Sequence, residues 1–522
     1  INADGHYGLV TGEVISIFIR NFVHLEVMAQ PFELLFLLSF FLIPLIFFIF
    51  RVIKSSKITQ LPPGPTPWPV LGNIFHMRNM PHITLTKFAK TYGPLVSLRL
   101  GTQYLVVGSS ASAAIEILKT HDRILSGRRV PSAIPFKRSV LDKISIGWAS
   151  ECNNGWRYFR TLCRTELFSS KILESQACLR EKKVMELVEF LRAKEGQVVN
   201  IGELVFATVL NMLSNVLTSK DMVNLEKETE DGGMRSLIRG LIEAFSAPNI
   251  SDFYPILGRL DLQGLRKKTM HVMTKIRSNW EPILEERRNF KGSGSSSQQD
   301  FLDTLLDNGV TNDCINQLFV ELLSAGSDTS TSTVEWAMAE LIKNGESMKK
   351  VQEELEIELS GSDHPKESQL LQMSYVHACV NETLRLHPPA PFLIPHRATE
   401  ACQVMSCTIP KDAQIFVNVW AISRDPLIWE EPEMFRPQRF LSSDIDFKGN
   451  DFEFLPFGAG RRICPGLPMA AIKVPLVLSS LVHFFDWELP QGKCPAELDM
   501  TEKFGVTLQK KEPLLLIPKA RK

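Results

Sequence analysis

One cysteine, Cys464, lies in a stretch whose composition could make its thiolate a metal ligand. Residues 457–466 are rich in Gly and Arg, and the apolar segment that follows, 467–485, is expected to be a helix. Glycines let backbone amides approach the sulfur, and a helix start offers free N–H groups and a positive dipole end, which favour thiolate over thiol. Arg462 adds a charge suited to a carboxylate. A thiolate held in this way is a good axial ligand for haem iron.

A single cysteine after such a loop could also be an ordinary small buried side chain. The spacing of its neighbours is more specific, because residues 457–466 follow the pattern Phe-x-x-Gly-x-Arg-x-Cys-x-Gly without a gap. In these residues the chain resembles the cytochrome P450 family, whose haem-binding signature has this form. The resemblance implies that Cys464 is the axial ligand of a haem b iron, and that Phe457, Arg462 and Gly466 also contact the cofactor.

A second stretch, Ala-Gly-Ser-Asp-Thr-Ser at 325–330, lies at the centre of a long predicted helix over 317–343. Gly and Ser/Thr weaken a helix, so in isolation the stretch could be a kink or a loop. It resembles the family's Ala/Gly-Gly-x-Asp/Glu-Thr-Thr/Ser motif at every position. The resemblance implies a groove for dioxygen and substrate, with Thr329 and Asp328 as the catalytic residues that deliver protons.

Other residues match the family at positions that would bind the haem carboxylates. Trp156 and Arg160 are four residues apart at the start of a predicted helix, so they share a face. An indole N–H and a guanidinium there could bond a haem propionate, although a packed ring beside a solvated arginine would look the same. The pair matches the family's Trp-x-x-x-Arg element. By its position, Arg397 is also expected to reach a propionate.

A further family element is expected to hold the core on the haem side. Glu382 and Arg385 form the pattern Glu-x-x-Arg on one face of a predicted helix. The family pairs this element with the arginine of a Pro-Glu-Arg-Phe segment; here Arg439 is retained, but Gln438 replaces the glutamate. The resemblance implies a buried network of Glu382, Arg385 and Arg439. Because position 438 is Gln, the negative charge that the family has beside this network is missing here. His387 precedes two prolines, and we interpret it as a turn residue.

The N-terminal part is expected to anchor the protein in a membrane. The first methionine is Met28, and we interpret residues 1–27 as translated upstream sequence or a non-native segment. Residues 28–53 contain an apolar run that could cross most of a bilayer, and basic residues follow it, which predicts that the remainder is cytosolic. A cleaved signal peptide would carry its positive charges before the run. Residues 54–69, basic and then Pro-rich, are expected to form a stiff hinge.

Composition excludes several kinds of protein. The chain has 522 residues with 58 basic and 58 acidic side chains, and this neutral balance argues against nucleic acid as a partner. The nine cysteines show no zinc-type spacing; Cys402 and Cys407 could be bridged, although two free thiols suit a reducing compartment better. A Gly-rich nucleotide-binding fingerprint is absent, so a haem protein of this sequence must receive electrons from another protein.

The body of the chain is predicted to be mainly α with a small β region. Residues 92–107 alternate and are rich in β-formers, which predicts a hairpin with its turn at 101–103. Helical periodicity dominates in the segments 111–120, 156–167, 175–193, 201–218 and 270–288. Length alone suggests about three domains. The resemblance instead implies one cytosolic haem-thiolate domain, 70–522, with the cytochrome P450 fold, preceded by one transmembrane helix.

The resemblance implies a monooxygenase that hydroxylates a small apolar specialised metabolite of alkaloid or terpenoid type with O₂. Electrons would come from NADPH–cytochrome P450 reductase, with cytochrome b5 as a second candidate donor. The hinge and the cysteine loop look like the plant microsomal branch, which implies a single-pass protein of the endoplasmic reticulum membrane in contact with lipid. Residues 120–127 and 446–456 resemble alkaloid-pathway members. Substrate contacts are expected from three apolar regions, at 134–146, 391–394 and 504–506.

Two alternatives remain open on the residues alone. The same haem chemistry could couple C–C or C–O bonds, or rearrange a substrate, without inserting oxygen. The chain could also be a membrane haem protein that binds ligands without turnover. The pair Asp328 and Thr329 argues against the second alternative, because a mere binding protein needs no proton relay.

Overall fold

The computed structural model describes residues 60–77, 80–225, 233–290, 300–360 and 364–521, together with positions 39 and 42. The chain divides into two units, Ile1–Thr59 and Gln60–Lys522, and every element below belongs to the second. The predicted membrane anchor at 28–53 lies outside the described residues apart from positions 39 and 42, which are helical. Residues 1–27, the first part of the hinge and the Gly/Ser-rich segment at 291–299 lie outside them as well.

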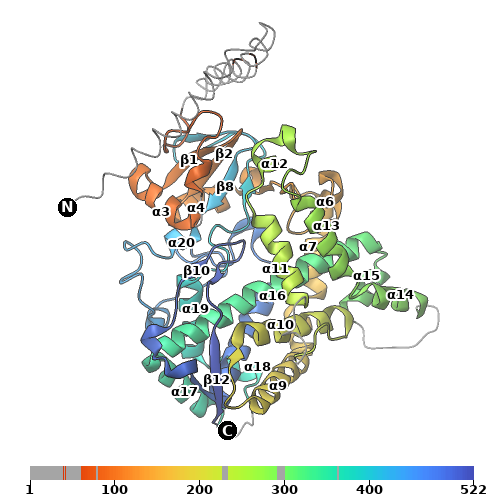
Figure 1. Cartoon of the computed structure of the whole chain (residues 1–522), viewed down its shortest axis with the longest axis vertical. Helices are drawn as coiled ribbons and strands as arrows, with labels where there is room; N and C mark the ends of the chain where they lie inside the picture. Colours follow the sequence, from red (N-terminus) through yellow and green to blue (C-terminus); the bar gives the residue numbers. More distant parts are fainter. Residues whose placement is uncertain are drawn as a thin grey trace, which may run out of the picture. The chain divides into compact units, whose positions relative to one another are not determined.

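Helices are the main secondary structure of the described chain, as the sequence predicts, and short strands and loops make up the rest (Figure 1). The α-helices are α3 (Pro81–Tyr92), α4 (Ala111–Ile115), α5 (Asp122–Leu125), α6 (Arg138–Ile144), α7 (Asn154–Glu166), α8 (Ser170–Ser175), α9 (Ala177–Ala193), α10 (Ile201–Thr218), α11 (Met234–Ser246), α12 (Ile250–Phe253), α13 (Leu265–Arg277), α14 (Glu281–Phe290), α15 (Phe301–Asp307), α16 (Asn312–Lys343), α17 (Gly345–Glu358), α18 (Glu367–Leu370), α19 (Ser374–Leu386), α20 (Val419–Ile422) and α21 (Leu467–Phe484). The strands are β1 (Leu95–Leu100), β2 (Gln103–Gly108), β3 (Gly127–Arg128), β4 (Val199–Asn200), β5 (His396–Arg397), β6 (Cys402–Val404), β7 (Cys407–Ile409), β8 (Gln414–Val417), β9 (Phe485–Glu488), β10 (Glu502–Lys503), β11 (Gln509–Lys510) and β12 (Leu515–Ala520).

Helix α16, with 32 residues, is the long helix on which several others pack (Figure 1). It contacts α10, α19 and α21. It runs without a break through positions 325–330, so that stretch is neither a loop nor a helix end. Helices α10 and α21 are long and apolar enough to cross a membrane, but most of each is buried inside the protein. Their uniform apolar character therefore reflects a place in the core.

The main sheet has five strands in the order β1-β2-β8-β5-β3. Strands β1 and β2 form the predicted hairpin, with Leu100 opposite Gln103 across the turn. Strand β8 runs parallel to β2, and the two-residue strand β5 pairs with both β8 and β3. The last pairing sets His396 opposite Arg128 and Arg397 opposite Gly127. The sheet thereby brings two segments far apart in the sequence to one edge of the functional site.

The Pro-rich part of the predicted hinge lies against the first strand of this sheet. Ser97 of β1 donates from its amide to the Pro63 carbonyl at 2.9 Å and from its hydroxyl to the Pro62 carbonyl at 2.6 Å. A side chain at Gly64 would collide with the Ser97 carbonyl. Proline cannot donate from its own nitrogen, so this segment is held by the donors of its neighbour.

The network predicted around Glu382 is present in the core. Arg385 donates to both Glu382 oxygens, from Nε at 2.7 Å and from Nη2 at 2.8 Å, and both side chains are fully buried. Arg439 Nε donates to the same carboxylate at 3.1 Å. Both guanidinium groups also lie over the ring of Trp429. Gln438 donates to the Tyr375 hydroxyl at 3.3 Å and so makes no ion pair where the family has a glutamate.

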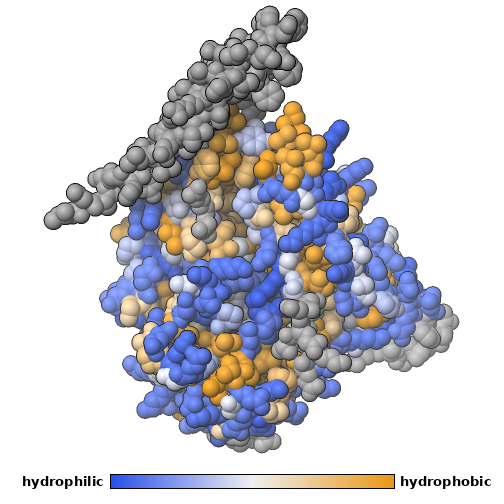
Figure 2. Space-filling view, viewed as in Figure 1, coloured by the Kyte–Doolittle hydropathy of each residue, from blue (hydrophilic) through white to orange (hydrophobic). Residues whose placement is uncertain are grey.

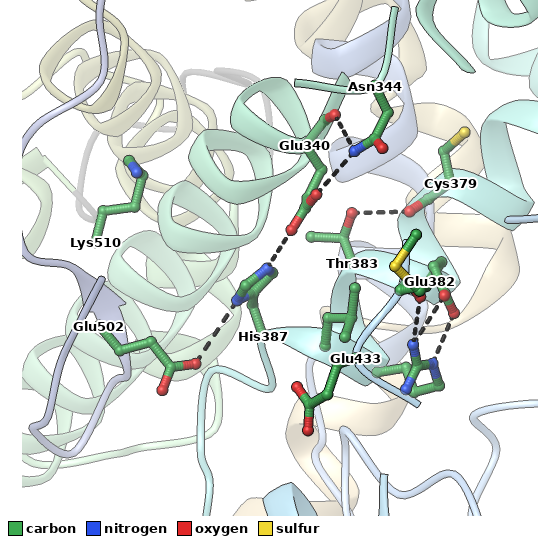
Figure 3. A network of polar contacts seen from close by, with 12 residues as sticks. Glu340, Asn344, Cys379, Glu382, Thr383, His387, Glu433, Glu502 and Lys510 are labelled. Atoms are coloured by element: carbon green, nitrogen blue, oxygen red, sulfur yellow. Dashed lines mark hydrogen bonds and ion pairs between the residues drawn. The ribbon is translucent and has the colours of Figure 1, made fainter. Parts of the chain in front are cut away.

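A second buried polar network surrounds His387 (Figure 3). The imidazole stacks on Trp336 with ring centroids 3.8 Å apart. Its Nε2 lies 2.8 Å from Glu340 of α16, and its Nδ1 lies 3.7 Å from Glu502 of β10. Burial acts to raise the pKa of Glu502, but His387, His82 and Arg424 outweigh it and hold that pKa well below its usual range. His387 therefore joins the C-terminal hairpin to the core, in agreement with a structural role.

All nine cysteines are free. Cys402 and Cys407 lie on the two strands of the hairpin β6–β7, where they are not paired with one another. The interpretation of this pair as two free thiols is therefore confirmed.

Candidate active site

The cysteine loop, residues 457–466, holds Cys464 just before the start of α21. Gly460 has a φ of +67°, and a side chain there would collide with the Leu118 carbonyl, so the position requires glycine. The Cys464 amide donates to the Phe457 carbonyl at 3.0 Å and closes the loop. The thiol is thus fixed by the backbone beside the free N–H groups of a helix start.

The environment of the Cys464 thiol suits a metal ligand more than a free thiolate. Burial raises the pKa of the thiol, while the amides of Gly466 and Leu467 and the charges of Arg160 and Lys473 act to lower it. The amides of the helix start thus act in the expected direction, toward the thiolate, and burial acts against them. Binding of a metal cation removes the proton, since the thiolate is the ligand.

A cavity of about 880 Å³ is bounded by the cysteine loop and by α16. Cys464 lines it from the loop, and Ala325, Gly326 and Thr329 line it from the helix. Ala325 is exposed within a helix that is otherwise largely buried, which marks the face turned to the cavity. Gly326 also satisfies helix packing, because a Cβ there would lie 2.8 Å from Leu213 of α10. The volume is at the upper end of the range for ligand pockets, about 300–1,000 Å³.

The two residues of the expected proton relay lie on different faces of α16. Thr329 lines the cavity, and its hydroxyl donates to the Ala325 carbonyl at 2.7 Å. Asp328 is buried away from the cavity, where its oxygens accept from Gln509 Nε2 at 2.8 and 3.0 Å. The structure therefore places Thr329 at the reaction site and Asp328 behind it.

Lys473 of α21 joins the two walls of the cavity. Its ammonium donates to the Gly326 carbonyl at 2.7 Å, and burial lowers its pKa to about 7. Cys464 acts to raise this pKa, so the two groups stabilise each other's charged form. Sequence patterns alone did not identify this residue, because a lysine in an apolar helix has no spacing that indicates its partner.

Guanidinium groups gather at one end of the cavity. Arg462 is buried and donates to the carbonyls of Ser126, Ile146 and Ala149. Arg160 lines the cavity and donates to the Ile463 carbonyl. The sequence did not single out two further residues here, Arg128 and His396, which β3 and β5 place in the lining.

Two residues expected to bind the haem carboxylates have other partners. The Trp156 indole donates to the Ile146 carbonyl at 3.0 Å, and the ring lies between Arg160 and Arg462. Arg397 is not among the lining residues; its Nη1 donates to Asp412 at 2.6 Å. Because neighbouring residues of a strand point to opposite faces, His396 faces the cavity where Arg397 does not.

The cationic end of the cavity fits the carboxylates of a haem. The hydrogen bonds that Arg128, Arg160 and Arg462 donate all go to backbone carbonyls, and burial lowers the pKa of each guanidinium. The Nε of Arg128 is buried without a partner. Unpaired buried guanidinium groups are costly, and they bind carboxylates strongly. An anion with two carboxylates and an apolar body above Cys464 therefore suits these residues.

Aromatic and aliphatic side chains line the remainder of the cavity. Of the predicted substrate regions, 391–394 and 504–506 line it throughout, whereas 134–146 contributes only Ile146. Aromatic residues that the sequence did not single out complete the wall; they are Trp148, Phe168, Phe245, Phe253 and Phe416. Their elements lie far apart in the chain, so only the fold brings them together.

Comparison with known proteins agrees with this geometry. The family model described as cytochrome P450 matches residues 62–517. The chain is 49% identical to a probable (S)-N-methylcoclaurine 3′-hydroxylase isozyme 2 of Coptis japonica over 91% of this chain and 96% of that protein. It is 47% identical to a corytuberine synthase of the same species, over 92% and 98% of the two chains. An (S)-N-methylcoclaurine 3′-hydroxylase isozyme 1 of Papaver somniferum is 46% identical over 91% and 98%.

These comparisons confirm the predicted fold class and the family resemblance, and with them a haem whose iron is bound by a thiolate. They also confirm the enzyme class, which requires a small-molecule substrate and a redox partner. The chain belongs to the cytochrome P450 family of haem-thiolate monooxygenases.

Proposed function

We propose that this enzyme hydroxylates a small, largely apolar plant metabolite of the alkaloid type. The observation that carries the proposal is the cavity itself, in which Cys464 and Thr329 line opposite walls and aromatic side chains form the rest. The names of the relatives support the alkaloid class, since two of those given above are N-methylcoclaurine hydroxylases. A terpenoid substrate is the less favoured choice, because the lining is rich in aromatic rings.

In this reaction one oxygen atom of O₂ enters a C–H bond of the substrate, and the other leaves as water with two electrons and two protons. The haem, when bound through Cys464, supplies the oxygen-activating chemistry. Arg128, Arg160 and Arg462 hold its carboxylates, and the apolar wall excludes water from the reacting carbon. The Thr329 hydroxyl is placed to hold a proton-donating water at the cavity.

Electrons are proposed to come from NADPH–cytochrome P450 reductase, with cytochrome b5 as a second donor, at the endoplasmic reticulum membrane. The anchor predicted at 28–53 supports this location. An apolar surface patch, visible at the upper end of Figure 2, supports contact with lipid. The exposed apolar residues of the patch are Trp68, Val70, Leu71, Phe75, Ile256, Leu260 and Leu262. The Tyr254 hydroxyl donates to the Val70 carbonyl at 3.0 Å and joins the two segments.

Product analysis under ¹⁸O₂ tests the proposed reaction. Microsomes that contain this chain and the reductase are supplied with NADPH and a panel of benzylisoquinoline, tropane and monoterpenoid compounds. We expect a benzylisoquinoline product that is heavier by one ¹⁸O atom, with label from O₂ and none from H₂¹⁸O. A panel without any oxygenated product would contradict the proposal.

A second candidate reaction is oxidative coupling or rearrangement without oxygen insertion. The observation that favours it is a relative whose name, corytuberine synthase, is that of a synthase and not of a hydroxylase; the match covers 92% of this chain. A coupled product would be lighter by two hydrogens, a rearranged product would keep the mass of the substrate, and neither would carry ¹⁸O. The same labelling experiment therefore separates the two candidates.

Replacement of Thr329 by alanine is expected to separate oxygen consumption from product formation. Loss of the hydroxyl removes the group that holds a proton donor at the cavity, while substrate binding remains. Since positioned proton transfer contributes about 10²–10⁴-fold to a rate, product formed per NADPH oxidised should fall by about tenfold or more.

The matched control for Thr329→Ala is Thr331→Ala on the same helix. The Thr331 hydroxyl is buried, has no hydrogen-bond partner and does not line the cavity. It should leave the ratio of product to NADPH unchanged. Equal coupling in the wild type and in Thr329→Ala would remove Thr329 from proton delivery.

A further inference from the structure

A carboxylate, Glu321, lines the cavity one helical turn before Ala325. Its oxygens accept from the amides of Ile146 and Gly147 at 2.9 and 3.0 Å, from Gln317 Nε2 at 2.8 Å, and from the Ser145 hydroxyl. Burial raises the pKa of Glu321, and these four donors act in the opposite direction. Four donors and no acceptor favour the ionised carboxylate and so limit the rise in its pKa that burial causes.

No protein cation forms an ion pair with this carboxylate within the described residues, although the charge of Arg462 acts on it from a greater distance. The hydrogen-bond donors of Glu321 are all neutral. The charge of Arg462 acts on Glu321 in the same way that the charge of Arg129 acts on Asp252, the other carboxylate among the lining residues. Glu321 is thus a buried carboxylate without an ion-pair partner among the described residues, at the wall of a cavity whose other walls are mostly apolar. Such a carboxylate is stabilised by a cation that enters with the ligand.

Aromatic rings line the same cavity as this carboxylate. Trp148 directly follows Gly147, one of the two amides that Glu321 accepts from, and its ring packs edge-on against Phe245 of α11 with centroids 5.9 Å apart. Both rings line the cavity. A cavity lined by a carboxylate and by aromatic rings is a favourable environment for a protonated amine, which can form an ion pair with the carboxylate and a cation–π contact with a ring.

We propose that Glu321 binds the protonated amine of the substrate. This inference rests on the proposed function and adds that the alkaloid enters as an ammonium ion. Glu321 and Ala325 are four residues apart on one helix face, about 6 Å along its axis. The ammonium is therefore held about one turn away from the part of α16 that faces Cys464. Oxidation takes place at a carbon remote from the nitrogen and not at the N-alkyl groups.

Spectral titration of the purified holoprotein tests this binding role. The probes are N-methylcoclaurine and its neutral N-formyl analogue, which has the same rings without the positive charge. We expect wild type to bind the amine at least about tenfold more tightly than the amide, because a buried charge pair is worth that much or more. Equal dissociation constants for the two probes in wild type would overturn the proposal, and this comparison requires no variant.

The variant Glu321→Gln keeps the size and most hydrogen-bonding capacity of the side chain but removes its charge. It should weaken binding of the amine by about ten- to a hundredfold and leave binding of the amide within about twofold. The control Ser145→Ala removes one loop contact of Glu321 without changing the charge, and it should affect both probes alike. If Glu321→Gln weakens both probes equally, Glu321 only holds the loop and the proposal is wrong.

The outcome is separable from that of the proposed function. Oxygenation of neutral compounds but of no amine would overturn the role of Glu321 and leave the monooxygenase proposal standing. Charge-dependent binding without any ¹⁸O-labelled product would support the role of Glu321 and contradict the proposed oxygenation. An N-dealkylated main product from N-methylcoclaurine would contradict the expected placement of the nitrogen.

Discussion

Replacement of Cys464 by serine is expected to abolish the thiolate-type carbon monoxide difference spectrum and all turnover. The hydroxyl of serine is far less acidic than a thiol, and its oxygen does not supply the electron density that favours O–O cleavage. The loop would still fold, because its closing hydrogen bond uses the Cys464 amide and not the side chain. The measurement is the reduced carbon monoxide difference spectrum of purified protein. A persistent thiolate-type band would show that another residue binds the iron.

Cys163→Ser is the matched control for this experiment. Cys163 is fully buried in α7, and burial raises the pKa of its thiol to about 12, but it does not line the cavity. This variant should retain the thiolate-type spectrum. Loss of the spectrum in both variants would point to a general loss of structure and not to ligation.

Replacement of Arg385 by methionine is expected to cause the largest loss of stability. It leaves Glu382 fully buried with only Arg439 and the Arg436 amide as donors, and it removes three bonds to backbone carbonyls. Removal of one partner of a buried ion pair costs about 3–5 kcal/mol. The free energy of unfolding, measured by denaturation with urea and tryptophan fluorescence, should fall by this amount.

Arg439→Met provides the comparison within the same network. Arg439 is more exposed than Arg385 and makes one bond to Glu382, so its loss should cost only about 1 kcal/mol. The double variant Glu382→Leu with Arg385→Met removes both charges and should recover much of the stability lost in Arg385→Met. Equal losses in Arg385→Met and Arg439→Met would contradict the view that burial sets the cost.

The parts of the site that follow from local spacing could be predicted from the sequence. The cysteine loop needs glycine and a following helix, and Ala325, Gly326 and Thr329 share a helix with a fixed period, so both halves of the cavity are evident in the pattern. Glu382 and Arg385 are likewise three residues apart on one helix. These predictions depend on contacts between near neighbours, which the sequence specifies directly.

The parts that depend on which way a side chain faces could not be predicted. In the two-residue strand β5, a shift of one position exchanges the two faces, so Arg397 pairs with Asp412 while His396 lines the cavity. The orientation of Asp328 on its helix could not be predicted either, because its partner, Gln509, lies in β11 and only the fold brings the two together. Glu321 looked like an ordinary residue of α16 because its partners lie some 175 positions earlier in the chain.

The hydrogen bond from Lys473 to the Gly326 carbonyl holds two walls of the cavity, α21 and α16, at a fixed distance. It ties the helix that follows the cysteine to the helix that carries the oxygen-side groove, and it does so with protein atoms alone. The bond thus helps to fix the spacing between these two helices. Substrate preference, in contrast, is expected to depend on the aromatic side chains of the cavity wall, such as Trp148 and Phe245, which lie on separate segments. Such an enzyme can acquire new substrates by exchanging those rings while the catalytic gap keeps its width.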